Sequence, residues 1–402
     1  MDKWIIKKIA DIAEVVSGGT PSTDIPEFWN GDVSWITPAD LSGYKYRYIS
    51  KGVRNISKTG LDNSSANLLP KNTVLLSSRA PIGYVAIAES ELATNQGFKN
   101  LICDDAQIDY RFMYYWLQLN VDVLKSFATG ATFPEISATT LKKIKVFLPG
   151  RKTQQKIANV LSAYDDLIEA NNRRIELLEQ TAQELYKEWF VRLRFPGHEH
   201  TKFEKGLPQG WKRNKIQKYY RTCSGGTPSR SKPEYFSNGI YPWVKTGEIK
   251  DCVIIDTEEY ITEDAVNASS AKVLPAKSVA MAMYGVNIGL LAYFDEKMTC
   301  NQACCVFSDK RTFSSKHYLY YYLKFIREYL LLISFGAAQQ NLSQELIKKI
   351  KIIMPSDAIV QAFEKQIDDI YDNVRILLEK NRNLTKQRDM LLPRLMSGKL
   401  KV

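Results

Sequence analysis

Apolar residues recur with a regular spacing in two stretches of the chain. In the middle of the chain, positions separated alternately by four and three residues are Ile157, Leu161, Tyr164, Ile168, Asn171, Ile175, Leu178, Ala182, Leu185 and Trp189. Near the end they are Phe363, Ile367, Ile370, Val374, Leu377, Asn381, Leu384, Arg388, Leu391 and Leu395. A period of about 3.5 residues is typical of helices that pack along a coiled-coil seam. The pattern predicts two long helices, and we expect Pro393 to end or kink the second.

Each seam contains one asparagine, and the positions of the two predict how the helices pair. Asn171 is the fifth residue of its seam and Asn381 is the sixth of its own. If the helices are antiparallel with flush ends, the two amides share a layer, whereas in a parallel pair each faces an aliphatic side chain. An unpaired buried amide costs about 1–3 kcal/mol, and a paired asparagine layer commonly sets the register. We therefore predict an antiparallel pair with Asn171 beside Asn381; the alternative is that either amide reaches water at the seam's edge.

Outside these two stretches, the pattern of apolar residues predicts both strands and helices. Short apolar segments bounded by turn residues predict strands over Asn72–Ser78, Gly83–Glu89 and Phe98–Cys103. Aromatic-rich segments predict helices over Tyr110–Lys125 and His317–Ile333. These features are typical of an α+β fold with a modest sheet.

The chain repeats itself once. SGGTPS occurs at Ser17–Ser22 and again at Ser224–Ser229, and LKKIKVFLP at Leu141–Pro149 is matched by IKKIKIIMP at Ile347–Pro355. The offset stays between 205 and 207 residues across the matched segments, which indicates one long duplicated unit. We predict two similar mixed α/β domains separated by two long helices that form an antiparallel coiled coil with pseudo-twofold symmetry. The predicted boundaries are 1–150 (first domain), 151–193 (central helix), 194–210 (linker), 211–356 (second domain) and 357–402 (C-terminal helix).

Composition and charge narrow the class of protein. The 402 residues include 45% hydrophobic and 25% charged residues, a mix typical of globular domains. No apolar run approaches the roughly 18 residues of a transmembrane helix, and the charged start is unlike a signal peptide. With six scattered cysteines, we expect reduced thiols and a cytoplasmic location. The net charge of +11 favours a polyanionic partner, for which nucleic acid is the commonest choice.

Motifs for catalysis are weak. The chain has no GxxxxGK[ST] phosphate loop and no Asn-Pro-Pro-aromatic or Asp-Pro-Pro-aromatic motif of adenine methyltransferases. His198 and His200 lack further metal ligands nearby, and Cys300, Cys304 and Cys305 have the wrong spacing for a zinc site, so we expect no metal and buried strand cysteines. Two short [DE]xK segments, at 248–250 and 295–297, have no counterpart in the first repeat. We therefore expect no catalytic residues in this chain.

Side chains with paired donors or acceptors are candidates for reading base edges. The candidate DNA-binding residues are Thr20, Lys45, Arg47, Arg79, Gln96 and Lys99 in the first repeat, and Thr227, Arg230, Lys245, Tyr284, Asn287 and Gln302 in the second. Each SGGTPS segment contains a glycine pair, Gly18-Gly19 or Gly225-Gly226, and we call these two segments the Gly-Gly loops. A Gly-Gly loop could present backbone N–H groups and Thr20 or Thr227 to a phosphate, or it could form a turn between strands. We favour the turn. Asn95-Gln96 and Asn301-Gln302, present in both repeats, are also open to a structural role.

The whole plan resembles the specificity subunit of Type I restriction–modification systems. The resemblance is carried by SGGTPST, FWNGDVSWITPADL, LPKNTVLLSSRAPIGYVAI, TNQGFKNLI, the segment from Gln154 to Phe190, and LLPRLMSGKL near the end. It implies that the two mixed domains are target recognition domains for a split DNA sequence. It implies that the helices act as spacer and docking surface for two methyltransferase subunits, which restriction and translocase subunits then join. S-adenosylmethionine, ATP and magnesium are then expected on those partners, and this chain is expected to be non-catalytic.

Two other functions remain open. The alternatives are a helical scaffold without DNA specificity and a free-standing DNA-modifying enzyme. Equal affinity of the assembled complex for specific and random duplexes would favour the scaffold, and cleavage or methylation of DNA by the purified chain alone would favour the enzyme. If the specificity-subunit reading holds, we expect the length of the helix pair to set the gap between half-sites. Removing one heptad from both helices shortens the pair by about 10 Å, which corresponds to about three base pairs.

Overall fold

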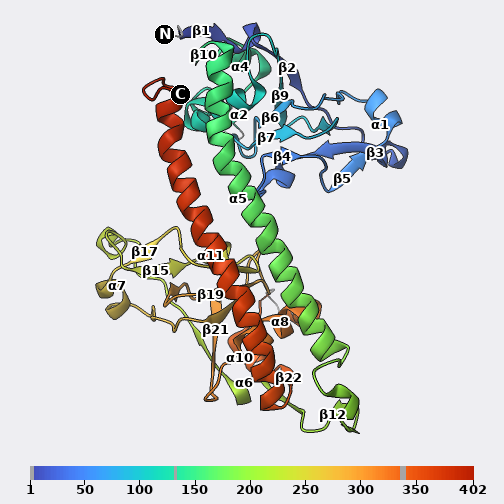
Figure 1. The fold of residues 1–402 in the computed structure, drawn as a ribbon, viewed down its shortest axis with the longest axis vertical. Helices are drawn as coiled ribbons and strands as arrows, with labels where there is room; N and C mark the ends of the chain where they lie inside the picture. Colours follow the sequence, from blue (N-terminus) through green and yellow to red (C-terminus); the bar gives the residue numbers. More distant parts are fainter. Residues whose placement is uncertain (1–3, 131–133, 336–340) are drawn as a thin grey trace. The chain divides into compact units, whose positions relative to one another are not determined.

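The computed structural model describes residues 4–130, 134–335 and 341–402 (Figure 1). The chain divides into two compact units. Unit 1 comprises Met1–Asn172 and Lys380–Val402, and unit 2 comprises Arg173–Glu379. The two long helices, α5 (Arg151–Tyr186) and α11 (Asp357–Met396), contribute residues to both units.

Unit 1 is built on three small sheets. The strand orders are β2 (Ala13–Ser17), β9 (Phe98–Cys103), β6 (Val74–Ser77), β7 (Val85–Ala88) and β4 (Tyr48–Ile49) in the first sheet; β5 (Arg54–Ile56), β3 (Trp29–Ile36) and β8 (Ala93–Thr94) in the second; and β1 (Ile5–Lys8) with β10 (Lys145–Leu148) in the third. Neighbouring strands are antiparallel except for the β4–β7 and β3–β8 pairs. The three strands predicted for the first repeat correspond to β6, β7 and β9.

Unit 2 has the same three sheets in the same strand order. They are β14 (Tyr220–Ser224), β21 (Cys304–Asp309), β18 (Ser278–Ala282), β19 (Leu291–Phe294) and β16 (Cys252–Ile254); β17 (Tyr260–Ile261), β15 (Tyr241–Val244) and β20 (Thr299–Cys300); and β13 (Lys212–Lys215) with β22 (Lys351–Met354). The parallel pairs, β16–β19 and β15–β20, also recur. The duplication in the sequence is therefore a duplication of topology, and the prediction of two similar mixed α/β domains is confirmed.

Short helices cover the sheets and cap their ends. They are α1 (Lys58–Asp62), α2 (Tyr110–Leu119), α3 (Val121–Ser126) and α4 (Ala138–Lys143) in unit 1, and α6 (Ile216–Tyr219), α7 (Glu263–Asn267), α8 (Lys316–Phe325), α9 (Arg327–Phe335) and α10 (Gln344–Lys349) in unit 2. The two aromatic-rich helices predicted as continuous are each interrupted. At the first break, Asn120 leaves helical geometry (φ −104°, ψ 16°) and its side-chain amide donates to the carbonyl of Trp116. Such local bonding of asparagine to the backbone competes with helix continuation.

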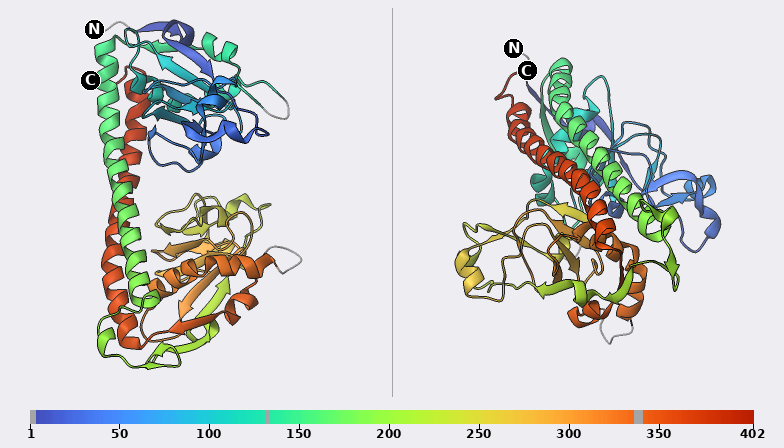
Figure 2. Two further views of the ribbon diagram at one scale, coloured as in Figure 1. Left: turned by 90° about the vertical axis from the view of Figure 1, so that its right-hand side faces the viewer. Right: turned by 60° about the horizontal axis from the view of Figure 1, so that its bottom comes forward.

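Helices α5 (Arg151–Tyr186) and α11 (Asp357–Met396) run side by side in opposite directions within each unit (Figure 2). In unit 1, Ile157 and Leu161 near the start of α5 share a core with Leu395 near the end of α11. In unit 2, Trp189, just beyond the end of α5, lies 5.8 Å from Phe363 near the start of α11, measured between ring centroids. The antiparallel seam predicted from the heptads is therefore present in both units.

Of the two effects expected for Pro393, ending or kinking the helix, the first is wrong, because α11 continues to Met396. Proline removes one backbone hydrogen bond and crowds the preceding turn. Here the loss falls in the last turn, where Leu392, Leu395 and Met396 are all buried in the core of unit 1. This apolar burial holds the final residues in helical register.

The two seam asparagines contact each other within unit 1. Asn171 Nδ2 donates a hydrogen bond of 2.8 Å to Asn381 Oδ1. Asn381 Nδ2 donates to Asn172 Oδ1 at 2.9 Å and to the carbonyl of Ile168 at 3.4 Å. Asn381 is only 9% exposed, so its amide is satisfied by protein atoms, as the shared layer of an antiparallel pair requires.

None of the helices in the described part of the chain is long and apolar enough to span a membrane.

Candidate nucleic-acid interface

The Gly-Gly loops are packed against strand ends in both units. A Cβ atom at Gly18 would lie 1.9 Å from the carbonyl oxygen of Asn95, and one at Gly225 would lie 1.9 Å from that of Cys300. Only glycine permits such close backbone approach. The indole N–H of Trp35 donates to the carbonyl of Gly19 at 2.9 Å. The Gly-Gly loops therefore have a structural role, because their close packing requires glycine.

The backbone N–H groups of these loops are largely occupied. Gly18 and Gly19 donate to the carbonyls of Phe98 and Thr94, and Gly226 donates to that of Cys300. These groups are consequently not available to cradle a phosphate. The geometry agrees with the turn that we favoured.

The loop threonines and the neighbouring glutamines are brought together in the same way in both units. Thr20 Oγ1 donates to Gln96 Oε1, and Thr227 Oγ1 donates to Gln302 Oε1. Thr227 is exposed and Thr20 is half-buried. In each unit, a pair of polar side chains that can hydrogen-bond to nucleic acid thus lies beside the Gly-Gly loop.

The asparagines that precede these glutamines have a structural role. Asn95 Oδ1 accepts from the backbone N–H of Gly97 at 2.9 Å, and Asn301 Oδ1 accepts from that of Ala303 at 3.1 Å. Each asparagine therefore forms a local turn after its strand. This is the structural alternative that the sequence left open.

Among the candidates in unit 1, Arg47 is not available to DNA. Its side chain is 7% exposed and its Nε donates to Glu169 Oε1 at 2.9 Å, while its Nη2 pairs with Asp166. Arg47 thus fastens the segment before β4 to helix α5. These contacts give Arg47 a structural role, which the sequence did not indicate because the two carboxylate partners lie more than 100 residues away. Its neighbour Lys45 is exposed.

The other two cations of unit 1 share one carboxylate. Lys99 Nζ lies 2.9 Å from Glu135 Oε1, and Arg79 Nη1 lies 3.5 Å from Glu135 Oε2. Lys99 is buried on β9, whereas the side chain of Arg79 is 38% exposed. Of the two, only Arg79 is placed to reach a ligand at the surface.

In unit 2, Arg230 and Lys245 meet at one carboxylate. Arg230 Nη1 donates to Glu259 Oε2 at 2.6 Å, and Lys245 Nζ donates to Glu259 Oε1 at 3.1 Å. The hydrogen bond from Arg230 holds the pKa of the Glu259 carboxyl below its usual value. The Arg230 guanidinium also lies over Trp243, 5.0 Å from the ring centroid. Arg230 is thereby held in one orientation at the exposed edge of the Gly-Gly loop.

The remaining two candidates of unit 2 have different environments. Asn287 Nδ2 donates to the carbonyls of Thr246 and Ile249, so its amide supports a loop. Tyr284 is 39% exposed, and partial burial raises the pKa of its phenol. Tyr284 therefore remains a candidate for stacking or hydrogen bonding, and Asn287 is better explained as structural.

The predicted strand cysteines lie inside unit 2. Cys300, Cys304 and Cys305 are each fully buried, and burial raises the pKa of the Cys305 thiol. Among the described residues, no group of three or more histidine, cysteine or acidic side chains is arranged to hold a metal ion.

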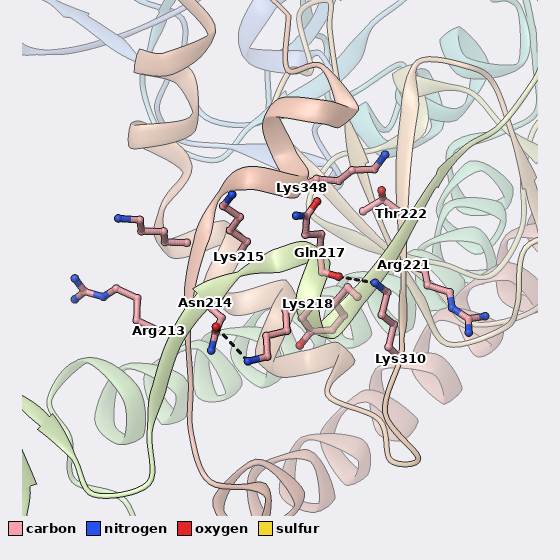
Figure 3. A pocket seen from close by; sticks show the side chains of 11 residues that line it. Arg213, Asn214, Lys215, Gln217, Lys218, Arg221, Thr222, Lys310 and Lys348 are labelled. Atoms are coloured by element: carbon pink, nitrogen blue, oxygen red, sulfur yellow. Dashed lines mark hydrogen bonds between the residues drawn. The ribbon is translucent and has the colours of Figure 1, made fainter.

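Sequence reasoning missed a basic hollow in unit 2 (Figure 3). Its cations come from β13, α6 and β14, from the turn after β21, and from α10 and β22. The segment KRNKIQKYYR at 212–221 carries a visible excess of positive charge. That excess was the available signal, but the cations that complete the hollow are contributed from beyond residue 300.

Comparison with known proteins places these features in a family. The family model described as the Type I restriction modification DNA specificity domain matches residues 1–180 and 208–386. The chain is 36% identical to the Type I restriction enzyme MjaIX specificity subunit of Methanocaldococcus jannaschii, over 99% of this chain and 94% of that protein. It is 27% identical to the HindI specificity subunit of Haemophilus influenzae, over 67% of this chain and 72% of that protein.

A solved structure shares the fold. The crystal structure of the Type I restriction–modification S subunit from M. genitalium matches with a TM-score of 0.58 and 18% identity, over 98% of this chain and 96% of that one. Two copies of one recognition-domain topology, the paired helices and the extent of these matches lead to one conclusion: this chain belongs to the family of Type I restriction–modification specificity subunits.

Proposed function

We propose that this chain recognises a bipartite DNA target, with each unit reading one half-site. The observation that carries the proposal is the repetition of one topology with different side chains at equivalent surface positions. Both units present a threonine–glutamine pair beside the Gly-Gly loop. The backbone bonds of Ser78 and Met283 align Arg79 in unit 1 with Tyr284 in unit 2, and these exposed side chains differ in charge and shape. Two units that share one topology but carry different surface side chains are suited to reading two half-sites of different sequence.

The proposal assigns a second role to the long helices, the docking of methyltransferase subunits. Large apolar side chains are exposed on α5 and α11 away from their seam. They include Leu167 and Met390 in unit 1 and Leu177 and Ile376 in unit 2, with exposed fractions from 40% to 62%. Exposed apolar residues on a regular helix favour protein contact when they cluster. Restriction subunits then join the assembled complex, and S-adenosylmethionine, ATP and magnesium are bound by these partners.

We further propose that the helix pair sets the gap between half-sites. Helix α5 has 36 residues, which corresponds to about 54 Å at 1.5 Å per residue. The segments 173–179 and 373–379 form one heptad on each helix, close to the Asn171–Asn381 layer but not including it. Deleting both retains the heptad phase and shortens the pair by about 10 Å.

Mapping methylated adenines in the source genome tests the proposal. We expect a bipartite methylated motif that disappears when the gene is deleted and returns when it is restored. Complementation with the double-heptad deletion is expected to abolish the motif or to change its gap by about three base pairs. A genome map that is unchanged by deletion of the gene would reject DNA specificity and favour a scaffold. Methylation or cleavage of DNA by the purified chain alone would instead indicate a free-standing enzyme.

A further inference from the structure

The basic hollow of unit 2 has a volume of about 860 Å³. Seven cationic side chains line it, together with Asn214, Gln217, Tyr220 and Thr222. The cations are Arg213, Lys215, Lys218, Arg221, Lys310, Lys348 and Lys351. No carboxylate is among the lining residues. The hollow is therefore a concentrated positive surface.

Little of this charge is neutralised by the protein. Lys348 lies 2.7 Å from Glu345, and it is the only one of the seven that forms an ion pair within the described residues. Lys218 Nζ donates to Asn214 Oδ1 at 3.3 Å, and Lys310 Nζ donates to the carbonyl of Gln217 at 2.5 Å, as Figure 3 shows. These neutral acceptors orient the two ammonium groups without removing their charge. Like charges gathered in this way repel one another, so an anionic ligand would stabilise them.

The repeated topology allows a direct comparison with unit 1. Strand pairing aligns Arg221 on β14 with Glu14 on β2. The backbone bonds Lys310 N to Tyr219 O and Asp104 N to Ile12 O align Lys310 with Asp104. The backbone bond from Ile216 N to Ile350 O in unit 2 matches the bond from Ile9 N to Ile144 O in unit 1, so Ile216 aligns with Ile9. Two residues after each of these isoleucines, Lys218 in unit 2 therefore aligns with Asp11 in unit 1.

A hollow also exists at this place in unit 1, and its charge is reversed. Its volume is about 380 Å³, and its lining includes Asp11, Glu14 and Asp104, with Lys142 as its cation. Three carboxylates thus occupy the positions of Lys218, Arg221 and Lys310. Because the same topology forms with either sign of charge, the fold does not require the cations of unit 2.

We propose that the basic hollow of unit 2 binds the phosphate backbone of double-stranded DNA, a contact that unit 1 lacks at the equivalent position. The inference rests on the proposed function and deepens it. Lysine, arginine, threonine, asparagine, glutamine and tyrosine are the side chains that commonly contact phosphates. Protein–protein interfaces are instead depleted in lysine and centred on apolar residues. Five lysines and no apolar centre therefore favour phosphate over an acidic protein surface.

The proposed contact makes the two units unequal in how they hold DNA. Each phosphate neutralised by a cation contributes about 0.9 to the slope of log affinity against log salt. Unit 2 then supplies a larger share of the salt-dependent affinity, although both units read bases. We expect unit 2 to contact more phosphates around its half-site than unit 1 contacts around the other half-site.

The test measures DNA affinity of the full chain, purified alone, as a function of salt. The probe is a fluorescently labelled DNA duplex of random sequence, about three helical turns long. Fluorescence anisotropy of this duplex measures binding. In the test variant Lys218, Arg221 and Lys310 are each replaced by glutamine. The matched control replaces Lys202, Lys205 and Lys297, which are exposed and do not line the hollow, with glutamine. Circular dichroism and thermal unfolding check that both variants are folded.

We expect the test variant to reduce the magnitude of the salt slope by about 2.7, at 0.9 for each of three lost phosphate contacts. The control is expected to change the slope by much less. A second variant, Lys218→Asp, Arg221→Glu and Lys310→Asp, installs the side chains of unit 1 and should weaken binding further. Equal salt slopes for the test variant and the wild-type chain would overturn the inference.

Two outcomes separate this inference from the proposed function. If the methylated motif depends on the gene but the salt slope is insensitive to the hollow, the inference fails and the proposed function stands. If the test variant keeps its DNA affinity but loses a co-expressed methyltransferase subunit, the hollow binds an acidic protein surface and the inference is overturned.

Discussion

The asparagine layer offers a sharp test of how the helix pair is held in register. Asn171→Leu removes the donor to Asn381 Oδ1, an acceptor on a residue that is only 9% exposed. A buried polar atom left without a partner costs about 1–3 kcal/mol. We therefore expect Asn171→Leu to destabilise the local helix pair by this amount.

The reciprocal change has a smaller expected effect. Asn381→Leu removes the partner of Asn171 and Asn172, but both of these side chains are half-buried and can turn to water. The double variant Asn171→Leu/Asn381→Leu leaves no orphaned atom on Asn381. Replacing both partners of a buried hydrogen bond with apolar groups is often nearly neutral. The two changes should therefore be strongly non-additive.

Hydrogen–deuterium exchange measures this locally, since a chain of two units is not expected to unfold in one step. Opening free energies for amides in the segments 165–172 and 378–385 are compared among the wild-type chain, both single variants and the double variant. We expect a coupling energy of about 1 kcal/mol or more. Additivity within about 0.3–0.5 kcal/mol, the range seen for independent sites, would refute the role of the layer. Ser64→Ala, outside both helices, serves as a control.

Two further predictions concern buried charge. His317 is fully buried, and burial lowers its pKa to about 4. Because the pKa is lower in the folded state than the roughly 6.5 of an unfolded chain, the unfolded state binds more protons between these values. Stability should fall by roughly 3 kcal/mol as pH drops from 6.5 to 4 and be insensitive to this group above 6.5. His317→Phe, which retains a ring beside Tyr293, should weaken this acid dependence in thermal unfolding of unit 2, and an identical pH profile would contradict the assignment. Separately, Arg47→Met leaves Glu169 largely buried without its cation and should destabilise unit 1 by roughly 3–5 kcal/mol. Adding Glu169→Met should restore most of that loss in urea unfolding, and no recovery would show that the pair is not the cause.

The parts of the fold that the sequence predicted are those encoded by short-range pattern. Heptad spacing identified α5 and α11, because a helix repeats its buried face every three or four residues. Short apolar segments bounded by turn residues identified β6, β7 and β9. The two-residue strands β4 and β8 were not predicted, since two residues do not establish a period. Their parallel pairing with β7 and β3 is a product of tertiary packing.

The candidate site was harder to predict, because its members are defined by distant partners. Thr20 and Gln96 were both identified, and their contact joins residues 76 positions apart. The structural contacts of Arg47 could not be predicted, because they depend on Asp166 and Glu169, which are 119 and 122 residues away. A cationic side chain in a loop is equally compatible with DNA contact and with a buried ion pair until its neighbours are known.

The duplication itself provides a way to separate structural from functional residues. Where close packing leaves no freedom, the two units agree: the Gly-Gly loops lie against backbone, and Trp35 and Trp243 donate to the carbonyls of Gly19 and Gly226. On exposed surface the fold imposes no such constraint, and there the two units carry opposite charges at equivalent positions. A charge reversal inside one chain, on one topology, is difficult to attribute to folding because each sign is compatible with the same strands. It is therefore at these divergent positions, more than at the repeated ones, that we expect the proposed DNA contacts of the two units to differ in strength.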